Sequence, residues 1–510
     1  MRTYLVIVLV CLVALCLSNP VKPNKYRRNM IRGRPVHGNG MKQLPKKDYS
    51  TVTRPSTAGT FTQKLDHIGD ATGTFSQRYW YNNQWYQPGG PAFLMLGGEG
   101  PEDPYWVESG NLEWTTMAQK AGAWVFDLEH RFYGETQPTP DMSTDNLKFL
   151  SSVQAIEDAA FFIQGMIQKF PQLASAKWVS FGGSYSGNLA AWLRVKHPEL
   201  VSYAVGSSGP VYAEVDFPEY LEVVQNSISS TDAGCAASVT SGFNQVAQLV
   251  QTAAGRASVK STFNICQDLD INNANLMAGF WETVYSPYME IVQYSGDNAG
   301  SFENALTIKN AICRFHNDNS SSVLQRMKKM NDYFDEMFGY FGCMDIDYND
   351  MIQWMQDTSY GEAADARAWV WQTCTEFGYY QSTSSPTSGP WFGGVNNLPC
   401  SYYVQQCADI YGSAYTADYV AQAVAVTNAY YGGRDNMNSS YIILPNGSFD
   451  PWHALGKLAS SDPTIVPVVI QGTSHCADMY GPGPNDSADL TAGRAKISST
   501  LLGWLGVSQH

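Results

Sequence analysis

The segment from Lys177 to Leu193 holds a serine in the setting that serine nucleophiles require. A short apolar run is followed by small residues, by Ser184 and then by a helix-forming stretch. This order predicts a strand, a sharp turn and a helix, with Ser184 at the apex of the turn. Residues two before and two after the serine must be small: Gly182 fits, whereas Ser186 fits less well and is followed by Gly187. The segment predicts a nucleophile elbow, and a glycine-rich turn without chemistry is the alternative.

The base that would activate this serine can be sought by elimination among the eight histidines. In an elbow of this kind the serine is followed along the chain first by an acid and then by the base. Six histidines lie before the elbow, on its helix, in the middle of the chain or at its end. His475 follows the apolar run 465–470 and precedes the last helical stretch, so it is the predicted base. His453 also remains, and we interpret it as a wall residue.

The acid that would orient His475 is expected on the loop after the preceding strand. The apolar run 441–444 leads into a loop that contains Asp450. Asp450 is therefore the predicted acid of a Ser184, Asp450 and His475 triad. A helix-capping aspartate is the alternative interpretation.

Acyl transfer also needs two backbone N–H groups that bind the developing oxyanion. Tyr185, directly after the serine, is expected to supply the first. The turn 97–100 is the expected source of the second, through Gly98 or Glu99, because glycines let a backbone approach the substrate closely. The sequence does not tell which amide points inward, and an ordinary glycine turn is the alternative.

The elements that must position these residues alternate between strand-like and helix-like patterns. Helical spacing of apolar residues covers 151–170, and a closing helix is expected over 487–505. Short apolar runs, each typical of a buried strand, lie at 91–96, 123–128, 177–181, 203–205, 441–444 and 465–470. Such alternation predicts an α/β fold with a mostly parallel sheet covered on both faces.

The stretch 211–415 interrupts this pattern with polar and aromatic helix-like segments and few strand candidates. We interpret it as a helical insertion into one α/β core made of 56–210 and 416–510. An insertion directly after the elbow helix would lie over the carboxyl ends of the strands, where ligands bind in open α/β sheets.

The stretch 1–55 has a different composition from the rest of the chain. Residues 1–18 combine Arg2, an apolar run and small residues near Ser18, which predicts a secretory signal peptide. The run is shorter than the roughly 20 residues of a spanning helix, so we expect no membrane anchor. Residues 19–55 are basic and rich in proline, typical of a disordered arm. A removable pro-segment, an arm for an acidic surface and a solvated tail are the alternatives.

The body of the chain is strongly acidic. The stretch 1–55 contains 11 of the 32 Lys and Arg and one of the 46 Asp and Glu. The rest therefore carries 21 basic and 45 acidic residues, a net charge of −24. Such a charge repels nucleic acid and anionic membranes, so we expect neither as a partner. Self-repulsion would be weaker in an acidic lumen, which agrees with a secreted or lysosomal location.

Eight cysteines remain beyond the predicted signal peptide, an even number that indicates disulfides in a secreted chain. Their pairing cannot be read from the sequence. No short Cys or His spacing indicates zinc, and we expect neither a metal nor a cofactor. Possible glycosylation points, each in an Asn-x-Ser frame, are Asn319, Asn438, Asn446 and Asn485.

Several motifs together resemble one peptidase family. They are Gln63–His67, Gly98–Gly100, Glu129–Glu135, Gly182–Tyr185, Gln372–Gly378, and Asn446–Gly447 with Asp450–Trp452. They are similar to those of the serine peptidase family of lysosomal Pro-X carboxypeptidase, dipeptidyl peptidase II and thymus-specific serine protease. The resemblance covers about residues 60–505 and is greatest to the thymus-specific branch.

The resemblance implies a helical lid over an α/β-hydrolase core and the triad already named. It also implies an exopeptidase that favours bonds after proline, with Trp452 lining the pocket for the proline ring, since aromatic walls suit that compact apolar ring. Glu99 and Glu376 are candidates for binding a peptide amino terminus. Structural ion pairs with an arginine such as Arg131 are the alternative for both.

We therefore expect a secreted or lysosomal serine peptidase that acts on peptides through an acyl-enzyme. An esterase or lipase on the same fold is one alternative, because a helical lid does not exclude it. A non-catalytic secreted binding homologue is the other. Carboxypeptidase and dipeptidyl peptidase action both remain open, as does a homodimer.

Overall fold

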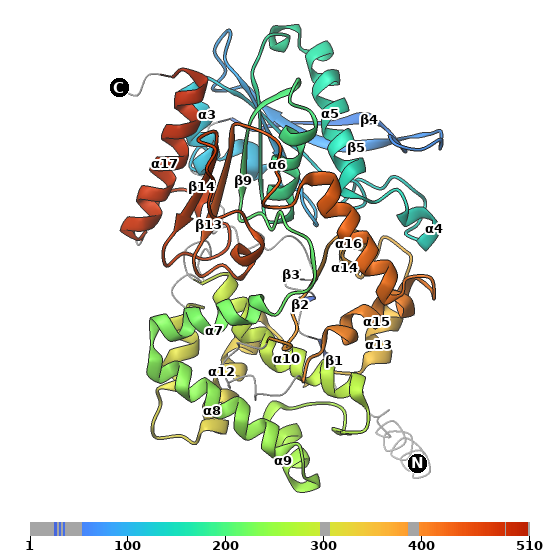
Figure 1. Cartoon of the computed structure of the whole chain (residues 1–510), viewed down its shortest axis with the longest axis vertical. Helices are drawn as coiled ribbons and strands as arrows, with labels where there is room; N and C mark the ends of the chain where they lie inside the picture. Colours follow the sequence, from blue (N-terminus) through green and yellow to red (C-terminus); the bar gives the residue numbers. More distant parts are fainter. Residues whose placement is uncertain are drawn as a thin grey trace, which may run out of the picture.

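An eight-stranded sheet runs through the upper half of the molecule (Figure 1). The computed structural model describes residues 25–27, 30–31, 34–35, 54–295, 306–385, 397–484 and 486–507 of the 510-residue chain. The strand order is β14-β13-β9-β8-β6-β7-β5-β4, parallel from β14 to β7 and antiparallel for β5 and β4. The strands are β4 (Thr57–Lys64), β5 (Thr74–Asn82), β6 (Ala92–Leu96), β7 (Trp124–Leu128), β8 (Trp178–Gly183), β9 (Val201–Ser207), β13 (Ile442–Gly447) and β14 (Ile465–Ile470).

Helices cover both faces of this sheet, which explains why its central strands are apolar throughout. Helices α3 (Glu113–Ala121) and α17 (Ala488–Leu505) lie on one side, and α5 (Ser152–Lys169) and α6 (Tyr185–Lys196) on the other (Figure 1). Successive strand residues point to opposite faces. Phe93 accordingly packs with the α3 and α17 side chains, and its neighbour Leu94 packs with those of α5 and α6. The predicted α/β class with a hydrolase-like core is confirmed.

Strands β9 and β13 pair side by side although the whole stretch 208–441 separates them along the chain. The residues between them form most of the lower half and the right-hand flank of Figure 1. Their elements are β10 (Glu214–Asp216), α7 (Glu219–Thr231), α8 (Ala233–Leu249), α9 (Ala253–Phe263), α10 (Ala274–Gln293), η4 (Ile308–Cys313), α11 (Arg314–His316), α12 (Val323–Phe338), β11 (Cys343–Met344), α13 (Tyr348–Met355), α14 (Ala364–Gln372), η5 (Thr373–Phe377), β12 (Gly378–Tyr380), α15 (Cys400–Tyr411) and α16 (Ala417–Tyr431). Helices dominate, as the sequence predicts, with β10 and β12 pairing in parallel.

Shorter elements complete the core. They are α2 (Tyr105–Glu108), α4 (Thr144–Leu147), η3 (Pro171–Leu173), η7 (Pro451–Leu455) and η8 (Ala477–Met479). Helix η7 follows β13 and η8 follows β14. The predicted acid lies directly before η7, and the predicted base lies in the loop before η8.

Three disulfides fasten the inserted helices to one another. Cys235 is bonded to Cys313, Cys266 to Cys343, and Cys374 to Cys407. The first two close long loops, 78 and 77 residues apart in the chain. Six of the eight expected cysteines are therefore bonded, and all six lie within the insertion 211–415.

The predicted signal peptide lies outside the described residues, whereas part of the basic arm is described. Lys25–Tyr26 forms strand β1, which pairs with β11, and Met30–Ile31 (β2) pairs with Arg34–Pro35 (β3). The Lys25 ammonium lies 3.0 Å from Asp350, and the Tyr26 hydroxyl donates to Asp335 at 2.7 Å. This short piece of the arm thus rests on an acidic part of the inserted helices. Among the helices that the structure describes, none is both long and apolar enough to cross a membrane.

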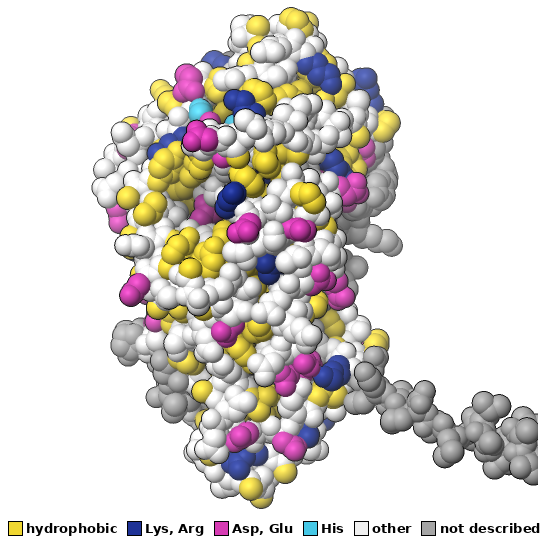
Figure 2. All heavy atoms as spheres, turned by 90° about the vertical axis from the view of Figure 1, so that its right-hand side faces the viewer, with side chains coloured by type: hydrophobic (Ala, Val, Ile, Leu, Met, Phe, Trp, Pro, Cys, Tyr) yellow, Lys and Arg dark blue, Asp and Glu magenta, His cyan; other side chains and the backbone are white. Residues whose placement is uncertain are grey.

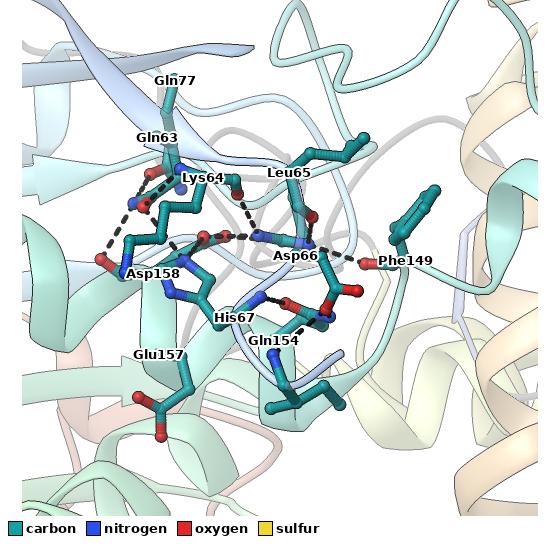
Figure 3. Close-up of polar contacts among 12 residues, drawn as sticks. Gln63, Lys64, Leu65, Asp66, His67, Gln77, Phe149, Gln154, Glu157 and Asp158 are labelled. Atoms are coloured by element: carbon teal, nitrogen blue, oxygen red, sulfur yellow. Dashed lines mark hydrogen bonds and ion pairs between the residues drawn. The ribbon is translucent and has the colours of Figure 1, made fainter. Parts of the chain in front are cut away.

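A buried ion pair joins the start of the core to helix α5. Arg131 donates through Nε and one terminal nitrogen to both oxygens of Asp158, each at 2.6 Å, and both side chains are almost fully buried. Asp158 also contacts His67 at 2.9 Å (Figure 3). The other guanidinium nitrogen donates to the carbonyls of Leu65 and Phe149. Two of the sequence motifs, Gln63–His67 and Glu129–Glu135, therefore meet in this structural network.

We expect Arg131→Met to lower the free energy of unfolding by roughly 3–5 kcal/mol, because Asp158 would stay buried without its cation. Urea unfolding followed by circular dichroism measures the change. Lys328→Met is the matched control, since Lys328 pairs with Asp332 on an exposed helix face and such pairs contribute about 0–1 kcal/mol. Equal losses in the two variants would contradict the assignment.

Candidate active site

The structure places Ser184 at a strained turn between β8 and α6. Its backbone has φ of 59° and ψ of −131°. This conformation is unfavourable for any residue that has a side chain. The Ser184 N–H donates to the carbonyl of Ser207 at 2.9 Å, which fastens the turn to β9. The predicted strand, turn and helix are all present, with the serine at the apex.

The spacing of small residues around this serine follows from close backbone contacts. A Cβ added to Gly182 would lie 2.0 Å from the carbonyl oxygen of Ser186, and one added to Gly187 would lie 2.6 Å from that of Ser207. The Ser186 hydroxyl accepts from the Gly183 N–H at 3.1 Å and donates to the Gly183 carbonyl at 2.8 Å. Ser186 is therefore a bonded part of the elbow, although its position fitted the pattern less well.

Asp450 and His475 come together at the ends of two neighbouring strands. Asp450 follows β13 and His475 follows β14, and Nδ1 of the imidazole lies 2.9 Å from Oδ1 of the carboxylate. Both side chains are fully buried. Burial lowers the pKa of His475, but the Asp450 charge and contact together with Cys476 outweigh this effect, and the net pKa is raised. Asp450 also caps η7 by accepting the Trp452 N–H at 2.9 Å, so the capping role and the contact with histidine coexist.

A small cavity beside the serine is lined by both the core and the inserted helices. Its lining residues are Glu99, Ser184, Tyr185, Pro210, Gln293, Tyr294, Trp369 and Trp452. The structure therefore unites four of the predicted site residues, Glu99, Ser184, Tyr185 and Trp452, which belong to three separate sequence motifs. The Tyr294 ring lies edge-on to His475, with centroids 6.0 Å apart, and the Gln293 carbonyl accepts the His475 N–H at 2.9 Å.

Four lining residues were missed by the sequence analysis: Pro210, Gln293, Tyr294 and Trp369. Gln293 ends α10, whereas Trp369 lies in α14, several helices further along the chain. The helical pattern marked these helices, but no signal in the sequence showed which of their faces turns to the sheet.

The glycine turn is supported from below by buried carboxyl groups. The Glu102 carboxyl group lies close to the Gly98 backbone, whereas Glu99 lies in the cavity beside the serine. Burial, together with Glu129, raises the pKa of Glu102 to about 8. Asp127 lies beneath them, fully buried, with its pKa raised by burial and by Glu102.

Glu376 lies away from the serine cavity, on the far side of Tyr185. Its carboxylate accepts from the backbone N–H of Ser152 at 2.8 Å and from the Ser152 hydroxyl at 2.6 Å. Burial raises the pKa of Glu376 to about 7. It forms part of the floor of a surface groove of about 420 Å³ beside α16, on a face where hydrophobic side chains gather around a hollow (Figure 2). Neither Glu376 nor Glu99 is bound by Arg131, whose described hydrogen bonds go to Asp158 and to backbone carbonyls.

The predicted glycosylation points differ in their exposure. Asn319 and Asn438 are exposed, and Asn485 lies outside the described residues. Asn446 is a correction: it is buried at the end of β13, and its amide donates to the Leu444 carbonyl. A glycan cannot reach Asn446 in the folded chain. Across the described ranges, no group of three or more His, Cys, Asp or Glu side chains could hold a metal ion.

The parallel sheet, the elbow between β8 and α6, and the acid and histidine after β13 and β14 define an α/β hydrolase with a large helical insertion. A family model described as Serine carboxypeptidase S28 matches residues 63–497. The chain therefore belongs to the S28 family of serine peptidases.

Individual relatives agree with this assignment. The chain is 62% identical, over 99% of both chains, to the Caenorhabditis elegans protein K12H4.7. That protein is assigned to the serine proteases by its name alone. It is 34% identical to the human thymus-specific serine protease, covering 89% of this chain and 87% of the relative. It is 25% identical to the mouse lysosomal Pro-X carboxypeptidase, covering 89% and 90%. A solved proline iminopeptidase from Mycobacterium smegmatis matches with 12% identity and a TM-score of 0.32, over 88% of this chain and all of that one.

The elbow glycine gives a direct test of this geometry. Gly182→Ala is expected to destabilise the chain by roughly 1–3 kcal/mol and to suppress labelling of Ser184 by a fluorophosphonate, because the added methyl forces α6 away from β8. Thermal unfolding and gel-based labelling measure the two effects. Gly503→Ala is the control, since nothing lies within 4 Å of its Cβ position in α17 and alanine favours helices. A Gly182→Ala protein that labels like the wild type would contradict the close contact.

Proposed function

We propose that the protein is a serine exopeptidase that cleaves peptides through an acyl-enzyme. The observation that carries the proposal is the combination of Ser184, strained and facing a cavity, with a buried His475 and Asp450 pair at 2.9 Å. In this assignment Ser184 is the nucleophile, His475 the general base and acid, and Asp450 the group that orients the imidazole. No cofactor is needed for this chemistry.

The reaction would follow from these roles. The Ser184 hydroxyl attacks the carbonyl carbon while His475 takes its proton, and the carbonyl oxygen becomes an oxyanion. The Tyr185 N–H binds this oxyanion, and Glu99 is our choice for the second N–H because Glu99, unlike Gly98, lines the cavity beside the serine. Collapse breaks the C–N bond, and the proton on His475 passes to the leaving amine. Water then repeats the sequence on the ester and frees the acid.

The surroundings of Trp452 support a preference for proline. Its ring lies 5.7 Å from Phe217, 5.6 Å from Tyr220 and 5.3 Å from Tyr379, measured between centroids. These buried rings hold Trp452 in place, and the cavity itself has aromatic walls in Trp452, Trp369 and Tyr294, which suit a compact apolar ring. The name of the mouse relative, lysosomal Pro-X carboxypeptidase, points in the same direction.

We also propose that residues 1–18 direct the chain into the secretory route, and that the insertion 211–415 is a lid that admits chain ends only.

Charge in the cavity bears on which end of the peptide is held. Glu99 lines the cavity, and its described lining contains no Lys or Arg. The segments 296–305 and 386–396, which lie outside the described residues, contain no Lys or Arg in their sequences either, and every Lys and Arg outside the described residues lies within 1–53. A substrate carboxylate is normally held by a cation, whereas an ammonium is held by a carboxylate. Of the two exopeptidase modes, we therefore favour release of residues from the amino terminus.

The triad predicts a specific pH response. His475 must be unprotonated to act as a base, so activity falls as pH drops through its pKa. Because the Asp450 charge raises that pKa, Asp450→Asn is expected to move the acid limb of kcat/KM to lower pH. It should also lower the plateau by roughly 10³–10⁴-fold, since the imidazole loses its orientation. Ser184→Ala, measured in parallel, sets the background; an unshifted limb would argue against the pair.

Peptides with blocked ends test the proposed end preference. Acetylating the amino terminus of a short proline-containing peptide is expected to lower kcat/KM by roughly 10–100-fold, since a hydrogen bond to a charged group contributes about 1.5–3 kcal/mol. Amidating the carboxyl terminus should change it by less than about 3-fold, because no described cation faces it. Mass spectrometry identifies the products, and Glu99→Gln should weaken the effect of acetylation.

The opposite pattern would identify a carboxypeptidase. Cleavage of small esters without any peptide would identify an esterase, and silence on both substrates would leave the non-catalytic homologue.

A further inference from the structure

Two sequence motifs that the proposed reaction does not use meet the elbow at one hydroxyl group. The Tyr185 side chain, directly after the serine, is buried. Its hydroxyl receives a hydrogen bond from Nε2 of Gln372 at 2.9 Å and lies 3.0 Å from Nε2 of His130. His130 belongs to the motif Glu129–Glu135, Gln372 begins the motif Gln372–Gly378, and Tyr185 belongs to the elbow itself.

The donors and acceptors of this network fit together in one direction. The Tyr133 hydroxyl donates to Oε1 of Gln372 at 2.7 Å, which leaves the amide nitrogen to face Tyr185 and Glu376. Nδ1 of His130 lies 2.7 Å from the Arg131 carbonyl, which can only accept, so Nδ1 carries the proton. Nε2 then accepts from the Tyr185 hydroxyl. Burial lowers the pKa of His130 to about 4, so the ring stays neutral at neutral and mildly acidic pH.

The ring of Tyr185 is also enclosed by the inserted helices. It packs on Trp369 with centroids 5.8 Å apart and on Phe377 at 5.4 Å. Gln372 lies between these two residues in the sequence, at the end of α14. The disulfide between Cys374 and Cys407 holds this stretch to α15. The insertion thus packs around the side chain of Tyr185, the residue whose backbone N–H lies beside Ser184.

Resting on the proposed function, we propose that Gln372 is a positioning residue, which holds the Tyr185 side chain so that the Tyr185 N–H and Ser184 keep their reactive geometry. Gln372 touches no substrate. It acts through Tyr185. Through Gln372, the insertion supports the turn that carries Ser184 and also covers the site. Glu376 then has a defined place as well, because its carboxylate ties Gln372 to Ser152 at the start of α5.

Small displacements at such a site are costly, which gives the proposal a measurable size. Loss of one oxyanion donor lowers kcat by about 10²–10³-fold, and a loosened donor costs less. We expect Gln372→Met and Tyr185→Phe each to lower kcat by about 10-fold, with KM changed less than about 2-fold. The double variant should be no slower than the slower single variant, because both changes break the same contact.

The experiment measures kcat and KM together with the rate at which a fluorophosphonate labels Ser184 in the full-length protein. Tyr288→Phe is the matched control, since it removes another buried hydroxyl of the insertion, bonded at 2.8 Å to a histidine nitrogen of His316, far from the elbow in sequence. It should lose thermal stability to a similar extent and keep its labelling rate. Tyr185→Phe keeps the ring, so it remains informative where Gln372→Met folds poorly.

Rates that stay within 2-fold of wild type in Gln372→Met and Tyr185→Phe, with only the melting temperature lowered, would overturn the inference and leave a purely structural network. Additive losses in the double variant would overturn it as well. A wild-type protein that no fluorophosphonate labels would instead overturn the proposed function, so the two failures are distinct.

Discussion

The close approach of helix α6 to the ends of β8 and β9 is the constraint on which the rest of the structure depends. A Cβ on Gly206 would lie 2.5 Å from the Gly187 carbonyl, and one on Gly182 would lie 2.0 Å from that of Ser186. Backbones can meet at these distances only where side chains are absent. This contact forces Ser184 into its positive φ and lifts its hydroxyl above the sheet. The strained turn persists because packing on both sides leaves it no other conformation.

The inserted helices turn this exposed serine into an enclosed site. They contribute Gln293, Tyr294 and Trp369 to the cavity wall. At their junction with the core, the Gln372 amide accepts from the Tyr133 hydroxyl and donates to that of Tyr185. Buried polar groups cost free energy when they lack partners, so the bonds of Gln372 favour one docking arrangement of insertion and core. Disulfides within the insertion restrict the arrangements available to its helices still further.

Local pattern was enough to predict much of the fold and the candidate site. The apolar runs gave the central strands, because residues buried on both faces must be apolar wherever they occur. Asp450 and His475 could be found because parallel strands end at the same edge of a sheet, so loops distant in the chain become neighbours. The pairing at 2.9 Å follows from that topology.

Contacts across the insertion could not be predicted in the same way. Nothing in the helical periodicity around Trp369 or Gln372 shows which neighbour each face will meet, since that depends on helices folded from distant segments. Glu376 illustrates the difficulty, because a buried carboxylate beside an aromatic motif fits a substrate contact and a structural tie equally well in sequence. Asn446 has an acceptor frame for a glycan, yet the strand that ends there buries it.

The carboxyl groups beneath the glycine turn have a consequence for the conditions in which the chain folds best. Glu102 and Asp127 have raised pKa values in the folded state, whereas unfolded carboxyls titrate at about 4. Folding therefore takes up protons when the pH lies between the unfolded pKa of about 4 and the raised pKa of the folded state. The stability that these groups give is complete in acid and declines as the pH rises toward about 8, where Glu102 ionises. Beneath the glycine turn, protonation thus removes the cost of burying two neighbouring charges.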